Sequence, residues 1–208
     1  MYTQSGRSMV EMLGVLAIIG VLSVGAISGY SKAMFKYKLN KHTEQMNTLI
    51  NAVARNVHSF DNIKQDGTSL TPYFIKMGEI PTEMVKSNDN NSVYDIFGLK
   101  WQILIDNGNI DLASLSKDGS PILSPNSSDS LAICQNILTI AKENSDNIML
   151  VVSRTKNLTY LILGDRYCDG TMMCLKNLTL DDIHTVCAKY EIVTFGFMWD
   201  LNESFFGD

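Results

Sequence analysis

The hydrophobic pattern separates an uncharged N-terminal run from a longer region of mixed character. The twenty residues from Met12 to Ser31 contain no charged side chain, and Lys32 ends the run. An α-helix needs about 20 apolar residues to cross a bilayer. The pattern therefore predicts a transmembrane helix over residues 7–31, with Glu11 near its N-terminal end.

The helical pattern continues beyond this run, because residues 30–66 contain no glycine or proline. Apolar side chains recur there at spacings of three and four, as in an amphipathic helix: Phe35, Leu39, Met46, Leu49, Ile50, Val53, Val57 and Phe60. We therefore expect residues 32–66 to extend the first helix. His42 falls on the apolar stripe, and we interpret it as a packed histidine rather than a ligand.

The remaining residues, 67–208, alternate short apolar runs with helical spacing and turn signals, which predicts a globular head domain. The polar residues 87–92 predict a loop, and Asp106–Asn109 is a hairpin signal. The expected strands are Lys100–Ile105, Ile110–Leu112, Ile148–Val152, Leu158–Leu163 and Glu191–Trp199, and the expected helices are Ser130–Glu143 and Thr179–Lys189. The predicted fold class is α+β, with a long N-terminal helix packed on a mostly antiparallel β-sheet.

Composition excludes some classes of function. Hydrophobic residues make up 45% of the chain and charged residues 19%, which is ordinary for a folded protein. The net charge is −5 and the basic residues of the head are scattered, so no nucleic-acid partner is indicated. None of the three histidines lies near a nucleophile motif, so we expect neither an enzyme nor a bound cofactor.

Four cysteines, all beyond the first helix, allow two interpretations: Cys134, Cys168, Cys174 and Cys187. In an exported domain an even number predicts two disulfides, with three possible connectivities. In a reducing compartment, Cys168, Cys174 and Cys187 with His184 would form a known set of zinc ligands, although the spacing is loose for a zinc module.

The charges that flank the first helix bear on its orientation. Arg7 is the one basic residue at the N-terminal end of the predicted helix, whereas four lysines follow the helix closely: Lys32, Lys36, Lys38 and Lys41. Basic residues tend to stay on the cytoplasmic side, so this asymmetry alone places the head domain in the cytoplasm.

Gly6, followed five residues later by Glu11 and then by an aliphatic helix, resembles the class III signal of type IV pilins and type II secretion pseudopilins. Three further stretches, Gly20–Gly25, Gly78–Met84 and Ile96–Ile103, resemble motifs of type IVb pilins of the PilS kind. The resemblance implies the type IV pilin fold. It also implies that a prepilin peptidase removes residues 1–6 by cutting between Gly6 and Arg7, and that the new N-terminus is methylated.

The resemblance further implies how such a chain works. The head domain would be periplasmic while the helix sits in the inner membrane, which is opposite to the orientation that the lysines favour. An assembly ATPase and a platform protein would then build other copies of the subunit into an extracellular helical pilus, which could serve in adhesion or secretion. Glu11 would pair with the N-terminus of a neighbouring subunit. Cys134 would bond to Cys187, and Cys168 to Cys174.

Two alternatives remain open. The first is a type II secretion pseudopilin or a minor pilin, although the four cysteines and the size of the head weigh against a pseudopilin. The second is a membrane protein with one transmembrane helix and a cytoplasmic metal-binding or ligand-binding domain, which the lysines and the Cys/His set favour.

Overall fold

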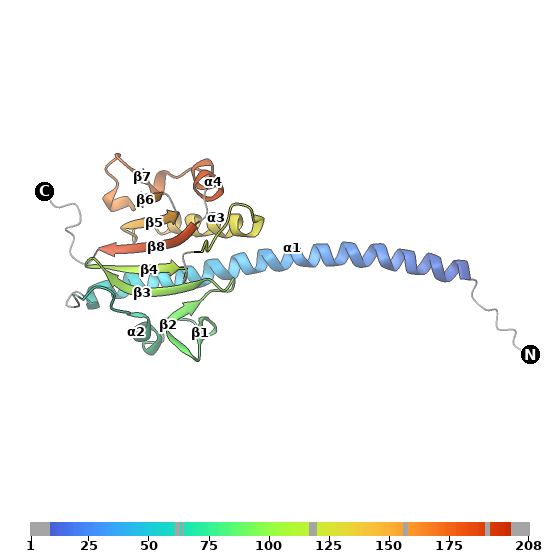
Figure 1. Cartoon of the computed structure of the whole chain (residues 1–208), viewed down its shortest axis with the longest axis horizontal. Coiled ribbons are helices and arrows are strands. Elements are labelled where there is room, and N and C mark those ends of the chain that lie inside the picture. Colours follow the sequence, from blue (N-terminus) through green and yellow to red (C-terminus); the bar gives the residue numbers. More distant parts are fainter. Residues whose placement is uncertain are drawn as a thin grey trace, which may run out of the picture. The chain divides into compact units, whose positions relative to one another are not determined.

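The computed structural model describes residues 9–60, 63, 65–116, 120–155, 158–189 and 192–200. The chain forms two compact units, Met1–Asn40 and Lys41–Asp208, which are described separately. The described part of the first unit is entirely helical and belongs to helix α1 (Met9–Asn56), which continues into the second unit (Figure 1).

Within the second unit, α1 buries one face. Its buried residues follow the three- and four-residue spacing of the sequence: His42, Gln45, Met46, Leu49, Ile50, Ala52 and Val53. A short 3-10 helix, η1 (Val57–Phe60), follows, whereas Ile63 and Gln65 are not helical, so the helical segment ends before the predicted residue 66. Because the apolar stripe faces the sheet, burial of these side chains holds the helix in the head.

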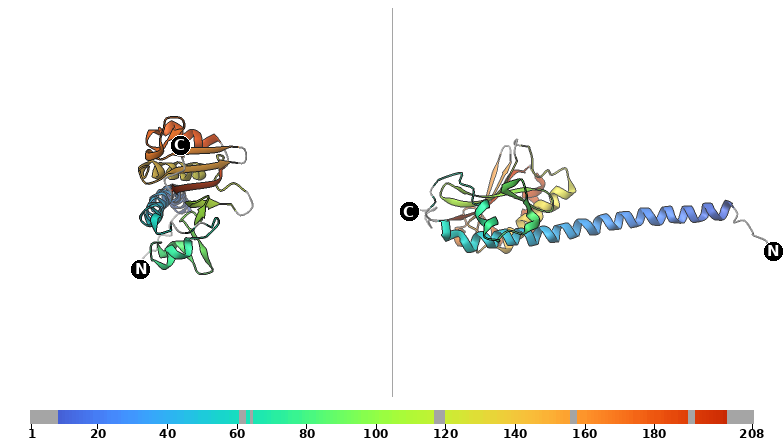
Figure 2. Two further views of the ribbon diagram at one scale, coloured as in Figure 1. Left: turned by 90° about the vertical axis from the view of Figure 1, so that its left-hand side faces the viewer. Right: turned by 90° about the horizontal axis from the view of Figure 1, so that it is seen from below.

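The second unit is built on an eight-stranded sheet with the order β1-β2-β3-β4-β8-β5-β6-β7 (Figures 1 and 2). All neighbours are antiparallel except β6 and β7, which confirms the predicted α+β class and the mostly antiparallel sheet. The strands are β1 (Val85–Lys86), β2 (Asp89–Tyr94), β3 (Lys100–Asp106), β4 (Asn109–Leu115), β5 (Leu150–Thr155), β6 (Thr159–Leu163), β7 (Met173–Cys174) and β8 (Ile192–Asp200).

Three more α-helices and three short 3-10 helices complete the unit: α2 (Thr71–Lys76), η2 (Thr82–Met84), α3 (Ser128–Glu143), η3 (Asp165–Tyr167), η4 (Leu175–Asn177) and α4 (Leu180–Lys189). Helix α3 lies beside α1. The side-chain amide of Asn144, the residue that follows α3, donates to Asn47 Oδ1 of α1 at 2.8 Å. Helix α4 contacts α3 in turn.

The hairpin between β3 and β4 shows why the turn prediction was right. Asn107 and Gly108 have φ angles of 50° and 75°, so both occupy the left-handed region that a two-residue hairpin turn requires. Asp106 pairs with Asn109 directly across the turn. Both strands extend further than the sequence pattern predicted.

The prediction of a loop over residues 87–92 was right for residues 87–88 and wrong for residues 89–92. Strand β2 begins at Asp89 and pairs with the short edge strand β1. The Asp89 carboxylate accepts hydrogen bonds from the Asn91 backbone N–H at 3.1 Å and from the Tyr94 hydroxyl at 2.9 Å. These side-chain contacts hold a polar segment in the edge hairpin, although its residues have a low intrinsic preference for strands.

Candidate functional site

The first part of the candidate site is the exposed half of α1. Every described residue from Met9 to Ala33 is solvent-exposed in the chain, and most of their side chains are apolar. This segment is long and apolar enough to cross a membrane, as expected from its sequence. Glu11 lies in the first turn of the helix. The expected cleavage site, Gly6 and Arg7, lies outside the described residues.

Two serine hydroxyls within this half are bonded to the helix itself. The Ser23 hydroxyl donates to the Ile19 carbonyl at 2.7 Å, and the Ser31 hydroxyl donates to the Ile27 carbonyl at 3.0 Å. In hydrocarbon an unpaired hydroxyl costs several kcal/mol, so these bonds suit the segment to lipid.

The head holds a buried network around Asp95 that the sequence did not reveal. Its carboxylate accepts hydrogen bonds from the backbone N–H groups of Phe97 and Leu99 at 2.8 and 3.0 Å, and from Trp101 Nε1 at 2.9 Å. His42 Nε2 lies 3.3 Å from Asp95 Oδ2 without the alignment of a hydrogen bond, and both side chains are fully buried.

On its other side His42 reaches the neighbouring helix. Its Nδ1 lies 2.9 Å from the Asn136 amide nitrogen, and its ring packs edge-on against Phe97 at 5.5 Å. His42 is thus a packed histidine, as the sequence predicted. It joins α1 to α3 and to the turn between β2 and β3.

An ion-pair cluster lies where α1 enters the head. Lys41 Nζ is 3.0 Å from both Glu44 Oε1 and Glu83 Oε1. The hydrogen bonds to Glu83 and Glu44 raise the pKa of Lys41, and the bond from Lys41 lowers the pKa of Glu83. These groups are solvated, so the cluster fixes the position of the η2 segment more than it stabilises the fold.

The structure pairs Cys134 with Cys187 and Cys168 with Cys174, the same pairing that the resemblance implied. The first bond joins α3 to α4 across a sequence separation of 53 residues, and the second closes a loop with a separation of only 6. No cysteine is free. Cys168, Cys174 and Cys187 of the alternative zinc set are all bonded to other cysteines in this structure, so their thiols are not available as ligands here.

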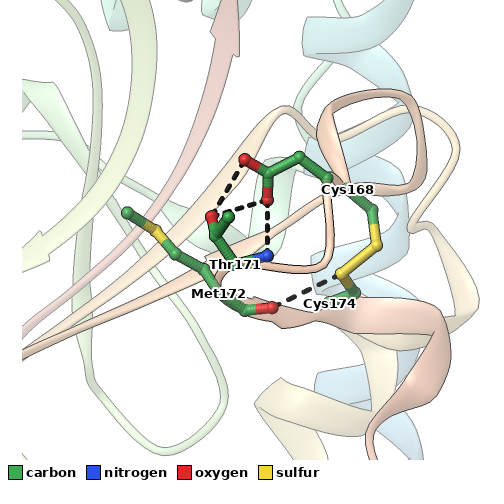
Figure 3. The surroundings of a disulfide bond; sticks show 5 residues. Cys168, Thr171, Met172 and Cys174 are labelled. Carbon is green, nitrogen blue, oxygen red and sulfur yellow. Dashed lines mark hydrogen bonds between the residues drawn. A yellow bond between two sulfur atoms is a disulfide. The ribbon is translucent and has the colours of Figure 1, made fainter.

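The small disulfide loop carries its own local order, shown in Figure 3. The Asp169 carboxylate accepts hydrogen bonds from the Thr171 backbone N–H at 2.8 Å and from its hydroxyl at 2.7 Å. The backbone and side-chain bonds from Thr171 hold the pKa of Asp169 below its usual range. Together with the disulfide they fix the loop that leads into β7, a strand at one edge of the sheet.

Asp111 is a titratable group of the head whose pKa is raised strongly by its surroundings. It lies on β4 between Leu104 of β3 and Met198 of β8 in one cross-strand row. Burial, and then the nearby charge of Asp106, raise its pKa to about 7. Its Oδ1 is buried and has no hydrogen-bond partner among the described residues. The carboxyl is thus protonated in mildly acidic solution and ionises near neutrality.

Within the described part of the chain, no group of three or more His, Cys, Asp or Glu side chains is placed to hold a metal ion. Comparison with protein-family models finds no matching family, and a search of curated proteins finds no match.

Proposed function

We propose that this chain is the structural subunit of a type IV pilus, nearest to the type IVb class, and that its N-terminal helix assembles into the core of an extracellular fibre. One observation carries the proposal. A single continuous helix has an exposed apolar half with a glutamate in its first turn, and its other half is built into a disulfide-closed head.

The exposed half of α1 requires partners. A helix that is apolar on all sides is stable only in lipid or against other helices. Four glycines are spread along it: Gly14, Gly20, Gly25 and Gly29. Apart from the adjacent backbone of the helix itself, a Cβ added at any of them would meet no atom within 4 Å. Since the fold of one chain does not demand these glycines, they suit close approach of a neighbouring helix.

Glu11 gives the packed helices a register. A carboxylate in hydrocarbon is expensive, and a charge left unpaired in a low-dielectric bundle costs more than a paired one. Cleavage after Gly6 would create an α-amino group close to Glu11 in sequence. If neighbouring helices are staggered along their axes, the amino group of one subunit reaches the Glu11 carboxylate of the next.

The two disulfides favour an exported head over a cytoplasmic one. Structural disulfides persist in the periplasm and outside the cell, and they are rare in the reducing cytoplasm. The bonded cysteines support the orientation implied by the pilin resemblance, against that favoured by Lys32, Lys36, Lys38 and Lys41. We therefore propose an inner-membrane precursor with a periplasmic head.

Intact mass tests the proposal directly. The protein is recovered from membranes and from sheared surface material, and it is weighed with and without reductant. We expect a chain that starts at Arg7, is four hydrogens lighter before reduction than after, and is abundant in the sheared fraction. A full-length chain with four free thiols would refute the proposal and favour a cytoplasmic head. Processed chain that never enters the sheared fraction would instead indicate a minor pilin or a pseudopilin.

A matched pair of variants tests the role of Glu11. Glu11→Ala should accumulate in the membrane with its head folded, yet yield little fibre. Glu143→Ala removes one exposed carboxylate from α3. It is the control, because it changes the net charge as Glu11→Ala does but leaves the N-terminal helix unaltered. If Glu11→Ala assembles as well as Glu143→Ala, the pairing role of Glu11 is wrong.

A further inference from the structure

A pocket of about 230 Å³ opens in the head where the end of α1 meets three other segments. The loop between α3 and β5, the η3 helix and the end of β8 complete its wall. Ala54, Val57 and Trp199 line its apolar part, whereas Asp146, Asn147 and Arg166 bring polar groups. All of these residues belong to the unit Lys41–Asp208.

The loop between α3 and β5 and the turn that leads from β6 into η3 are fixed against each other by backbone hydrogen bonds. Gly164 N–H donates to the Met149 carbonyl and Asp165 N–H donates to the Ser145 carbonyl, both at 2.8 Å. A Cβ on Gly164 would lie 1.6 Å from the Ile148 carbonyl oxygen, so only glycine permits this approach. The polar side chains of the pocket therefore stand on a preformed backbone.

The charges of the pocket define what it accepts. Arg166 is exposed, and among the described residues it forms no ion pair or hydrogen bond, which leaves its guanidinium available to an anion. Such a group binds a carboxylate through two parallel hydrogen bonds. Asp146 and Asn147 are also exposed and offer acceptors and donors for hydroxyl groups.

Trp199 adds a second, independent observation. The residue is only 4% exposed, and its ring nitrogen is buried without a hydrogen-bond partner among the described residues. Buried indole N–H groups normally have a partner, and one without a partner calls for an explanation. A ligand oxygen, or a water that it brings, would satisfy this donor with a slight movement of the pocket wall.

We propose that this pocket binds a carboxylate-bearing monosaccharide unit, such as a hexuronic acid. Arg166 pairs with the carboxylate, and Asp146 and Asn147 contact ring hydroxyls above the apolar part of the wall. The volume is below the range of about 300–1,000 Å³ typical of sites for drug-sized ligands, so it suits a single sugar unit. The binding does not depend on fibre assembly, so it stands or falls separately from the proposed function.

The two tryptophans of the chain make the experiment specific. The full chain is purified in detergent micelles with 5-fluorotryptophan, and its two ¹⁹F signals are assigned with Trp199→Phe. Trp101 is fully buried and bonded to Asp95, so its signal serves as an internal reference for folding. Galacturonate is the probe, galactose is the control without a carboxylate, and acetate is the control without a sugar ring.

We expect galacturonate to shift the Trp199 signal saturably while the Trp101 signal stays in place. Galactose and acetate should each bind at least about tenfold more weakly, since each lacks part of the polar contacts. Arg166→Met should weaken galacturonate binding by at least about tenfold. Arg154→Met, which removes an exposed arginine outside the pocket, should leave it unchanged.

Three results would overturn the proposal. The first is a Trp199 signal that does not move at any soluble galacturonate concentration. The second is equal binding of acetate or galactose, which would show that the pocket does not recognise a carboxylated sugar. The third is an equal affinity for galacturonate in Arg166→Met and Arg154→Met, which would show that the Arg166 guanidinium does not contact the ligand.

Discussion

The two disulfides should contribute unequally to stability, because they close loops of very different length. In the chain-entropy model, cross-linking removes conformational freedom from the unfolded chain in proportion to the logarithm of loop length. For the separation of 53 residues between Cys134 and Cys187, the model predicts about 4 kcal/mol at 25 °C. For the separation of 6 between Cys168 and Cys174, it predicts about 2 kcal/mol.

The test compares two double variants, Cys134→Ala/Cys187→Ala and Cys168→Ala/Cys174→Ala. Urea unfolding of the full chain in detergent micelles gives the free energy of unfolding of each variant. We expect the first variant to lose about 2 kcal/mol more than the second, because the longer loop regains more freedom when unfolded.

Packing must be separated from cross-linking, because Cys134 and Cys187 are almost fully buried. Replacing a buried sulfur by a methyl hydrogen leaves a small cavity that costs stability by itself. Repeating the series in excess reductant measures this packing cost, since no protein in it then has a disulfide. After subtraction, equal losses or a larger loss for the short loop would refute the loop-length argument.

Three further predictions follow from the head domain. Asp95→Asn should lower the free energy of unfolding by about 3 kcal/mol, because the carboxylate accepts three N–H groups and an amide NH₂ cannot accept. A loss below about 1 kcal/mol, measured by urea unfolding, would contradict this. The pKa of Asp111 is raised from 3.8 to about 7 in the folded head. Between these values the folded head holds a proton that the unfolded chain releases. The free energy of unfolding should therefore fall by a few kcal/mol from about pH 4 to pH 8. Asp111→Asn should flatten this profile and be more stable than wild type above pH 7; unfolding curves with the same pH slope in both proteins would disprove the assignment. Thr179→Ala should cost about 1 kcal/mol by removing the cap of α4, and thermal melting that matches an exposed Ser59→Ala control would exclude a capping role.

Local signals in the sequence predicted several elements correctly. The helix predicted over Thr179–Lys189 is present as α4. Thr179 and Asp182 form a reciprocal cap at its start: the Asp182 backbone N–H donates to Thr179 Oγ1 at 3.1 Å, and the Thr179 N–H donates to Asp182 Oδ2 at 2.9 Å. The strands expected at Ile148–Val152 and Leu158–Leu163 are present as β5 and β6, which pair with each other in a hairpin. In each case the residues that specify the structure lie within a few positions of one another, so their spacing alone carries the information.

The position of the last strand lay beyond such reasoning. Strand β8 inserts between β4 and β5, which places the C-terminal strand at the centre of the sheet. A continuous apolar run, Phe195–Trp199, was the available signal, because strands buried on both faces lose the alternation of polar and apolar residues. Such a run indicates a central strand, but it does not predict which strands pair with it, because pairing depends on contacts between residues distant in sequence.

The sequence by itself determined the long helix, its exposed apolar half, the turn at Asn107–Gly108 and the presence of enough cysteines for two disulfides. These features depend on periodicity, composition and backbone preference, which are local properties. Only the tertiary structure decided the environments of Asp95, Asp111 and Arg166. A carboxylate or guanidinium takes its character from the neighbours that desolvate it, bond to it or leave it unpaired, and the fold brings those neighbours from distant parts of the chain.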